Sequence, residues 1–426
     1  MCTKLRLMAT VRALSRVAIP LLAITFVPMV AMAQDSERIE KLENQVETLA
    51  QQVEQLTRML GEQRQQSVTR QDLEQVQRQV EQAATKQEVE ELQTEVNQNA
   101  EFRFADSVVH LAGYGSARYV DGDEADSSFG VSSFNPIFHF QYKDLVLLEA
   151  EFEFEIEDDG STKTELEYLT VDLLLHDYVT LLGGKFLSPV GYFRQNLHPA
   201  WINKLPSAPI GFGHDQAAPV AEVGFQARGG LPLPADMRLN YAVYGGNGPR
   251  LEVSGGEIEA VETEGFGGDD NGNKVVGGRI GIRPLPKLEI GISGATGQAR
   301  VAGDADRDYD VIDVDFNLSG LDFAPGLDIR GEFVTTYLGE GGVLDPEKKR
   351  WSAWYLQAAY LMPWFPVEGV VRYGEFDFPT DQHEQWSFGI NYLFANQLIA
   401  KAAYETNDFD LGVDEDRWLV ELAFGF

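Results

Sequence analysis

The chain has 426 residues and a formal net charge of −33 at pH 7, because 67 Asp and Glu oppose 34 Lys and Arg. This charge excludes nucleic acid as an expected partner, since phosphate binding requires Lys and Arg. It also argues against docking on anionic lipid through a basic patch. The mean hydropathy of −0.22 and the lack of a long apolar run beyond residue 33 exclude a helical membrane protein. They leave open a β-barrel, whose inward polar residues dilute its outward apolar ones.

The first 33 residues have the pattern of a secretory signal peptide. Lys4, Arg6, Arg12 and Arg16 precede an apolar run at 17–30, and a small-residue cleavage sequence follows at 31–33. A retained anchor helix is the alternative, which the shortness of the run and its two prolines disfavour. Cys2 lies at the start of the leader, so we expect a mature chain without cysteine or lipid. Losing the four basic residues leaves 30 Lys and Arg against 67 Asp and Glu, a net charge of −37.

Residues 34–102 are predicted to form a periplasmic α-helical coiled coil. Their apolar residues recur at spacings of three and four, which is the heptad pattern. The seam consists of Ile39, Leu42, Val46, Leu49, Val53, Leu56 and Leu60, and then of Leu73, Val76, Val80, Val89, Leu92 and Val96. A single solvated helix is the alternative, but so narrow a stripe requires a partner helix. β-Branched residues at one seam position favour two helices, whereas the barrel predicted downstream favours three, and the number stays open.

From residue 103 to 426 the apolar pattern has a period of two. In the last strand Trp418, Val420, Leu422, Phe424 and Phe426 share one face. Sixteen strands are predicted, at 108–119, 134–142, 145–157, 163–175, 178–186, 221–229, 236–246, 274–283, 287–298, 309–319, 326–337, 350–361, 366–376, 385–394, 398–406 and 416–426. Tight turns follow the even-numbered strands and longer acidic loops follow the odd-numbered ones. We therefore predict an all-β fold, a 16-stranded antiparallel transmembrane β-barrel with an N-terminal α-helical coiled coil.

The longest connection, residues 187–220, is the candidate constriction of this barrel. It is rich in aromatic residues and carries five prolines, which is unusual for a simple loop tip. Its polar and aromatic candidates are Arg194, His198, Trp201, Lys204 and His214. A sixteen-stranded barrel is too wide for side chains to fill, so we expect this segment to fold inward and narrow the channel. The alternative is that it packs outside or reaches a neighbouring subunit.

Residues 184–191, which read Gly-Lys-Phe-Leu-Ser-Pro-Val-Gly, close the fifth strand and enter this loop. The octapeptide resembles the corresponding stretch of the phosphate-selective porin O and P family. Strand number, loop position and the terminal Phe426 extend the resemblance over residues 103–426. It implies a homotrimer of sixteen-stranded diffusion channels, and the N-terminal coil is similar to the subgroup associated with dicarboxylate uptake. A terminal aromatic residue also resembles the assembly signal that the barrel-insertion machinery reads in porins.

Alternation predicts which charged side chains line the channel. The acidic candidates are Glu149, Glu151, Glu153, Glu155 and Glu157 on the third strand, with Glu165 and Glu167 on the fourth. The basic candidates, from later strands, are Lys185, Arg228, Arg238, Arg279, Arg283, Arg330, Arg372, Lys401 and Arg417. An acidic wall opposite a basic wall would create a transverse field that orients solutes and filters ions. The alternative is that these charges pair with each other and brace the wall. The phosphate-selective members line their pores with Arg and Lys, and the acidic strand departs from that pattern.

Catalytic, cofactor and metal sites are not expected. The six histidines, at 110, 139, 176, 198, 214 and 383, have no motif relation to a nucleophile or carboxylate. Asp304, Asp306, Asp308 and Asp310 mimic the start of a calcium loop, but Tyr309 and Asp315 occupy the positions where Gly and Glu are required. The acidic loops are instead expected to meet divalent ions that bridge lipopolysaccharide.

The sequence thus predicts an outer-membrane porin that admits small hydrophilic solutes, ions and other charged species included, by passive diffusion. The barrel would lie in the lipid of the bacterial outer membrane with its coil in the periplasm. A structural tether that contacts peptidoglycan through the coil is the alternative from another functional class. Conductance across a planar bilayer discriminates the two, because a plugged tether shows no channel steps.

Overall fold

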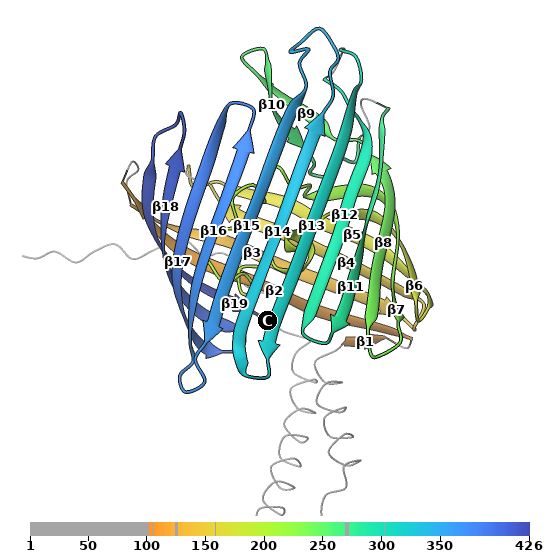
Figure 1. The fold of residues 1–426 in the computed structure, drawn as a ribbon. Helices are drawn as coiled ribbons and strands as arrows, with labels where there is room; N and C mark the ends of the chain where they lie inside the picture. Colours follow the sequence, from red (N-terminus) through yellow and green to blue (C-terminus); the bar gives the residue numbers. More distant parts are fainter. Residues whose placement is uncertain (1–101, 105, 124–126, 158, 269–271, 302) are drawn as a thin grey trace, which may run out of the picture. The chain divides into compact units, whose positions relative to one another are not determined.

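The computed structural model describes residues 102–104, 106–123, 127–157, 159–268, 272–301 and 303–426 (Figure 1). The predicted leader at 1–33 lies outside these residues, and so does the predicted coil except for its last position, Phe102. Within the described part of the chain, no helix is long and apolar enough to cross a membrane.

Sixteen long strands form one antiparallel sheet that closes on itself (Figure 1). They are β2 (Ser107–Gly122), β3 (Ser128–Tyr142), β4 (Val146–Ile156), β5 (Thr162–His176), β6 (Val179–Leu187), β7 (Ala221–Pro232), β8 (Arg238–Asn247), β11 (Lys274–Leu285), β12 (Leu288–Ala299), β13 (Arg307–Leu321), β14 (Ala324–Leu338), β15 (Lys349–Leu361), β16 (Val367–Phe378), β17 (Asp381–Ala395), β18 (Leu398–Phe409) and β19 (Glu415–Gly425). Short β1 (Phe102–Phe104) pairs with β2. The sixteen predicted strands and the closed barrel are confirmed.

Closure of the barrel depends on pairing between its first and last strands. β19 pairs with β2, and the backbone amides and carbonyls of Gly113 and Phe426 exchange two hydrogen bonds, each 2.9 Å long. β8 pairs with β11 across the connection 248–273. Each long strand therefore has two neighbours, and the barrel has no free edge among the described residues.

Apolar side chains cover the outer face of the barrel. In β19, Trp418 and Leu422 point outward and are about half exposed, at 56% and 50%, whereas Leu419, Glu421 and Ala423 point inward and are buried. The same alternation recurs around the sheet. A face of this kind requires apolar surroundings, because each exposed aliphatic side chain would cost free energy in water.

The two ends of the barrel differ in their connections. Connections at the end where the chain terminates, the turn end, have two to five residues, whereas those at the other end, the loop end, include the long segments 188–220, 248–273 and 339–348 beside shorter ones such as 379–380. The connection 248–273 contains a hairpin of β9 (Arg250–Ser254) and β10 (Glu257–Glu262), which was predicted only as loop. Leu251, Ile258 and Val261 are buried in the main apolar cluster, so the hairpin packs against the loop end of the barrel (Figure 1).

Candidate functional site

The connection 188–220 folds into the barrel, and we call it the inner loop. It leaves β6 and returns to β7 through a narrow neck, where the Ser188 amide donates to the Val220 carbonyl at 2.9 Å. It includes the single turn α4 (Phe193–Asn196). Between these points it contacts side chains from β12 to β18, and Trp201 lies beside the backbone of Gly425 in β19. The inward path predicted for this segment is therefore the one that the structure describes.

Glu332 of β14 anchors the start of the inner loop. The Tyr192 and Phe193 amides donate to its two carboxylate oxygens at 3.0 and 2.9 Å. The Gly191 amide donates to the Ser293 hydroxyl of β12 at 2.8 Å. Phe193 then packs edge-on against Tyr355 of β15. Buried backbone donors require such partners, so these contacts determine where the loop enters the barrel.

Both glycines of the octapeptide 184–191 have a structural requirement. A Cβ on Gly191, whose φ is +86°, would lie 2.1 Å from the Glu332 carboxylate. A Cβ on Gly184, whose φ is +136°, would lie 2.1 Å from the Leu169 carbonyl on β5. Gly184 thus permits strand pairing and Gly191 permits loop docking.

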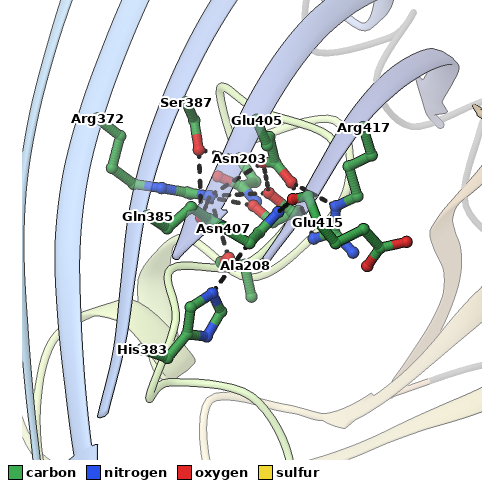
Figure 2. A network of polar contacts seen from close by, with 11 residues as sticks. Asn203, Ala208, Arg372, His383, Gln385, Ser387, Glu405, Asn407, Glu415 and Arg417 are labelled. Atoms are coloured by element: carbon green, nitrogen blue, oxygen red, sulfur yellow. Dashed lines mark hydrogen bonds and ion pairs between the residues drawn. The ribbon is translucent and has the colours of Figure 1, made fainter. Parts of the chain in front are cut away.

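A buried polar network on β16 to β19 holds the far side of the inner loop (Figure 2). Arg372 donates to the Ser207 and Ala208 carbonyls at 3.0 and 3.1 Å and to the Ser207 hydroxyl at 2.8 Å. Glu405 accepts hydrogen bonds from Ser207, from Ser387 and, at 2.8 Å, from Arg417. Arg372 and Glu405 are almost completely buried and 3.6 Å apart.

Two further anchors involve lysines. Lys401 of β18 donates to the Ala200 carbonyl and pairs with Glu421 at 2.7 Å. Lys204 of the loop pairs with Glu368 of β16. The Lys204 carbonyl accepts from the Asn391 amide of β17 at 2.8 Å. Each anchor joins a charged wall residue to loop backbone or to an opposite charge.

We expect replacement of Arg372 by Met to weaken this network. Met keeps much of the side-chain volume, but the loop carbonyls lose their donor and Glu405 keeps only Arg417 as a cationic partner. Removing one partner of a buried ion pair costs about 3–5 kcal/mol. Thermal unfolding of the purified protein, followed by circular dichroism, should show a lower melting temperature than the matched variant Arg350→Met, whose ion pair is exposed. Equal melting temperatures would contradict the anchoring role.

The basic residues of β14 to β19 that were predicted to face the acidic wall point inward, but most of them are occupied by the ion pairs and loop contacts described above. Arg372 and Lys401 lie beneath the inner loop, and Arg417 pairs with Glu405. Arg330 is buried and pairs with Asp328 at 2.6 Å. For these four residues the structure agrees with the alternative interpretation, in which charges pair and brace the wall. An exposed basic wall on β14 to β19 is therefore a wrong expectation.

Open space lies on the other side of the inner loop, beside β4 to β8. Two adjoining cavities of about 330 and 320 Å³ share the side chains of Gln195, Gln226 and Arg228. The first also touches Thr180, Pro189, Asn240, Tyr241 and Arg279, and the second also touches Ile137, Glu149, Glu151, Tyr168, Thr170, Asn196, His198 and Pro199. The lining is predominantly polar, and the loop supplies one side of it.

The acidic ladder of β4 faces this space. Glu149 and Glu151 line the second cavity, and Glu151 accepts hydrogen bonds from Tyr114 and Asn135 at 2.8 and 3.2 Å. Glu153 lies opposite Glu165 in the sheet, and Glu155 lies opposite Lys163. Glu157 is exposed just beyond the strand.

Glu167 occupies a β-bulge in β5, which inserts one extra residue opposite β4. Its side chain is buried and lies next to that of Glu153. The carboxylates of the β4 ladder therefore lie beside those of Glu165 and Glu167, and Glu165 also pairs with Lys163 at 2.9 Å. Their role in lining a pore stays a prediction.

Three basic residues on the open side, Arg228, Arg279 and Arg283, are paired with carboxylates. Arg228 pairs with Asp172 and lies 3.9 Å from Glu149. Arg279 pairs with Asp315 at 2.6 Å and with Glu289 at 3.2 Å. Arg283 also pairs with Glu289, at 2.8 Å. Arg238 lies opposite Arg283 in the β8–β11 register, at the turn end of the barrel.

Lys185 does not line the channel, so its predicted inward position is wrong. It lies opposite Leu169 and Val223, and Leu169 is exposed on the outer face. β6 is apolar on both faces, since Leu182 and Phe186 point inward and are buried in the main apolar cluster. The alternation of charged and apolar residues therefore assigned Lys185 to the inner face of this strand, whereas it lies on the outer face.

Sequence reasoning missed a histidine pair at the turn end of the barrel. His110 and His139 lie opposite each other in the β2–β3 register, with their Nδ1 atoms 3.2 Å apart. His139 contacts Glu149 at 3.2 Å, which links the pair to Arg228 and Asp172. The two residues are 29 positions apart, so only the strand register could have revealed the contact.

The five inner-loop candidates have different surroundings. His198 lines the second cavity and donates to the Arg194 carbonyl, whereas Arg194 is buried and donates to Phe212. Trp201 packs beside Gly425 of β19, and Lys204 is the anchor to Glu368. His214 pairs with Glu264 at 2.8 Å, near β10.

No metal centre is found in the described ranges, because no three His, Cys, Asp or Glu side chains converge there as ligands would. The carboxylate of Asp304, the first residue of the calcium-like sequence, accepts the Val343 and Leu344 amides at 2.7 and 3.2 Å. Asp306 contacts Arg300 and Asn273. These residues join neighbouring loops.

The docking of the inner loop should depend on pH through His198. Burial lowers its pKa to about 4, so His198 contributes stability that is complete above the ordinary imidazole pKa of ~6.5 and declines as the pH falls toward 4. The hydrogen bond to Glu264 raises the pKa of His214, whose contribution is present at low pH and is lost as pH rises. We expect the rate of proteolysis within 188–220 to increase as the pH falls from 6.5 to 4. In His198→Asn this increase should be smaller. An identical pH profile for that variant would refute the assignment to His198.

No protein-family model matches the chain, and no curated protein sequence matches it. Solved structures resemble it in fold. The anion-selective porin from Comamonas acidovorans is 13% identical with a TM-score of 0.54, over 75% of this chain and 100% of that one. The outer membrane channel DcaP of Acinetobacter baumannii is 12% identical with a TM-score of 0.53, over 77% and 100%. The trimer form of in-vitro folded OmpT from Vibrio cholerae is 11% identical with a TM-score of 0.50, over 75% and 99%. At these identities the likeness establishes the sixteen-stranded barrel fold.

Proposed function

We propose that this protein is a porin of the bacterial outer membrane, a passive channel for small hydrophilic solutes. The observation that carries the proposal is the pair of adjoining polar cavities inside a closed barrel whose outer face is apolar. Hydrocarbon accommodates such a barrel because each long strand among the described residues pairs on both sides. A polar, charge-lined interior has the opposite requirement and favours water.

The inner loop would act as the constriction. It occupies the lumen beside β12 to β19 and leaves space beside β4 to β8, so it would limit the size of solutes that pass. Paired wall charges that also bind the loop support a rigid constriction. A mobile plug would not require so many buried ionic anchors.

Three further parts of the proposal rest on sequence and fold likeness. The chain would be a homotrimer, and the trimer form of OmpT from Vibrio cholerae, which shares the barrel fold, supports this assembly. Its predicted coil would lie in the periplasm, since an even strand number returns the C-terminus to the side from which the first strand begins. Membership of the phosphate-selective porin O and P family remains a prediction from residues 184–191.

Recording from single molecules in planar bilayers tests the proposed function. Purified protein should produce discrete conductance steps that stay open at low voltage, because the loop leaves a permanent water path. Matched bilayers with detergent alone provide the control. A correctly folded barrel, verified by its slower electrophoretic mobility after heating, that never conducts would overturn the proposal.

A further inference from the structure

The inner loop affects the two charged walls of the barrel differently. On β16 to β19 it covers Arg372 and Lys401, both of which are about 1% exposed, and binds them through its carbonyls. Glu405 pairs with both Arg372 and Arg417, and Glu421 pairs with Lys401. Cations that are buried and paired in this way contribute little to the potential in the open part of the lumen.

The opposite wall stays uncovered, and carboxylates predominate on it. Glu149, whose side chain is 24% exposed, lines the second cavity, whereas Glu151 lines it while being only 1% exposed, so Glu149 carries this part of the acidic surface. The hydrogen bonds described for Glu151 come from the neutral side chains of Tyr114 and Asn135. Glu153, Glu155 and Glu165 continue the acidic surface toward the loop end of the barrel, accompanied by Lys163.

Two of the arginine side chains that reach the open lumen each lie between two carboxylates. Arg228 lies between Asp172 and Glu149, and Arg279 lies between Asp315 and Glu289. Because Arg279 and Arg283 share Glu289, the three arginines Arg228, Arg279 and Arg283 together face four carboxylates, those of Asp172, Glu149, Asp315 and Glu289. These pairs leave one excess negative charge, which the exposed Arg238 at the turn end offsets, so the negative charge of the path comes from β4 and β5.

The mouth of the channel at the loop end also carries negative charge. The carboxylates of Asp215, Glu252, Glu262 and Glu264 lie close together there with Arg250 among them, and Glu264 pairs with His214 at 2.8 Å. These groups surround the end of the inner loop near the β9–β10 hairpin. A cation approaching from this side therefore meets a negative potential before it reaches the ladder.

We propose that the lumen selects small cations over anions, and that the uncovered wall of β4 and β5 is the selectivity-determining surface. The proposal rests on the proposed channel function and deepens it by naming the solute class, which includes inorganic monovalent cations and small organic ammonium ions. Rings or rows of carboxylates attract cations and repel anions in a narrow water path. The selectivity therefore differs from what the phosphate-selective resemblance implies.

The reversal potential across a planar bilayer with a tenfold KCl gradient tests this inference. Wild-type protein should give a permeability ratio of K⁺ to Cl⁻ above one at about 0.1 M, with a lower ratio at about 1 M, where salt shortens the screening length from ~10 to ~3 Å. The triple variant Glu149→Gln, Glu151→Gln, Glu153→Gln should shift the ratio toward anions. The control variant Glu257→Gln, Glu340→Gln, Glu347→Gln removes the same charge from exposed loop positions and should shift it less.

The outcomes separate the two proposals. Absence of conductance steps would refute the channel itself. Steps with a wild-type ratio at or below one would leave the channel intact and overturn the cation preference. A cation-selective wild type whose ratio is unchanged in the triple variant would overturn the assignment to β4, and Glu149→Gln alone supplies the comparison where the triple variant fails to assemble.

Discussion

Replacing Glu332 with Ala is expected to release the start of the inner loop, raise single-channel conductance and lower the thermal stability of the barrel. Its carboxylate accepts both the Tyr192 and Phe193 amides; Phe193 is buried and Tyr192 is half-buried. An unpaired buried donor costs about 1–3 kcal/mol, so the loss of both is comparable with the stability of many docked segments. The loop would then leave the wall and widen the water path.

Glu332→Gln is the matched control. Its carbonyl oxygen can still accept an amide hydrogen, so its conductance and melting temperature should lie between those of the wild type and Glu332→Ala. Bilayer recording and thermal unfolding measure the two quantities on the same preparation. If Glu332→Ala kept wild-type conductance and an unchanged melting temperature, the loop would not depend on this anchor.

Replacing Phe426 with Ala is expected to prevent normal assembly. The Phe426 backbone closes the barrel through Gly113, while its ring points outward, 42% exposed, beside Phe134 and Phe424. A purely packing role for this ring is worth roughly 1.5–3 kcal/mol and would leave a barrel that inserts but melts earlier. The predicted role as an assembly signal instead leaves unassembled chain in the periplasm, because Ala keeps the backbone bonds and removes only the ring.

Fractionation of cells that express Phe426→Ala distinguishes these roles. Phe424→Ala is the control, since it removes a neighbouring outward ring with similar exposure and keeps the terminal residue. We expect periplasmic accumulation for the first variant and outer-membrane insertion for the second. A normal outer-membrane yield of Phe426→Ala would leave only the packing role.

The barrel could be predicted from the sequence because alternation of apolar and polar residues is local. Sixteen segments repeat it, and the alternation alone is enough to assign Glu149, Arg372 and Lys401 to the inner face. Lys185 shows the limit of this rule, since Leu181 and Leu182 make both faces of its strand apolar. The β9–β10 hairpin was missed because its strands have only five and six residues.

The arrangement of the site could not be predicted in the same way. Which wall the inner loop covers depends on contacts between residues more than 100 positions apart, such as Tyr192 with Glu332 and Ser207 with Arg372. No periodic pattern encodes these pairings. The expected opposition of an acidic and a basic wall therefore becomes an exposed acidic wall and a covered basic one, and this changes the expected selectivity.

Substituted-cysteine labelling tests most directly whether water passes along β4 to β8 and is excluded from the wall beneath the inner loop. In a Cys2→Ser background, Glu149→Cys and Ser387→Cys place single thiols on the uncovered and covered walls; Ser387 is 0% exposed. A membrane-impermeant cationic methanethiosulfonate should react with Glu149→Cys and reduce the current, and it should leave Ser387→Cys unlabelled. Rapid labelling of Ser387→Cys with no reaction at Glu149→Cys would contradict the account.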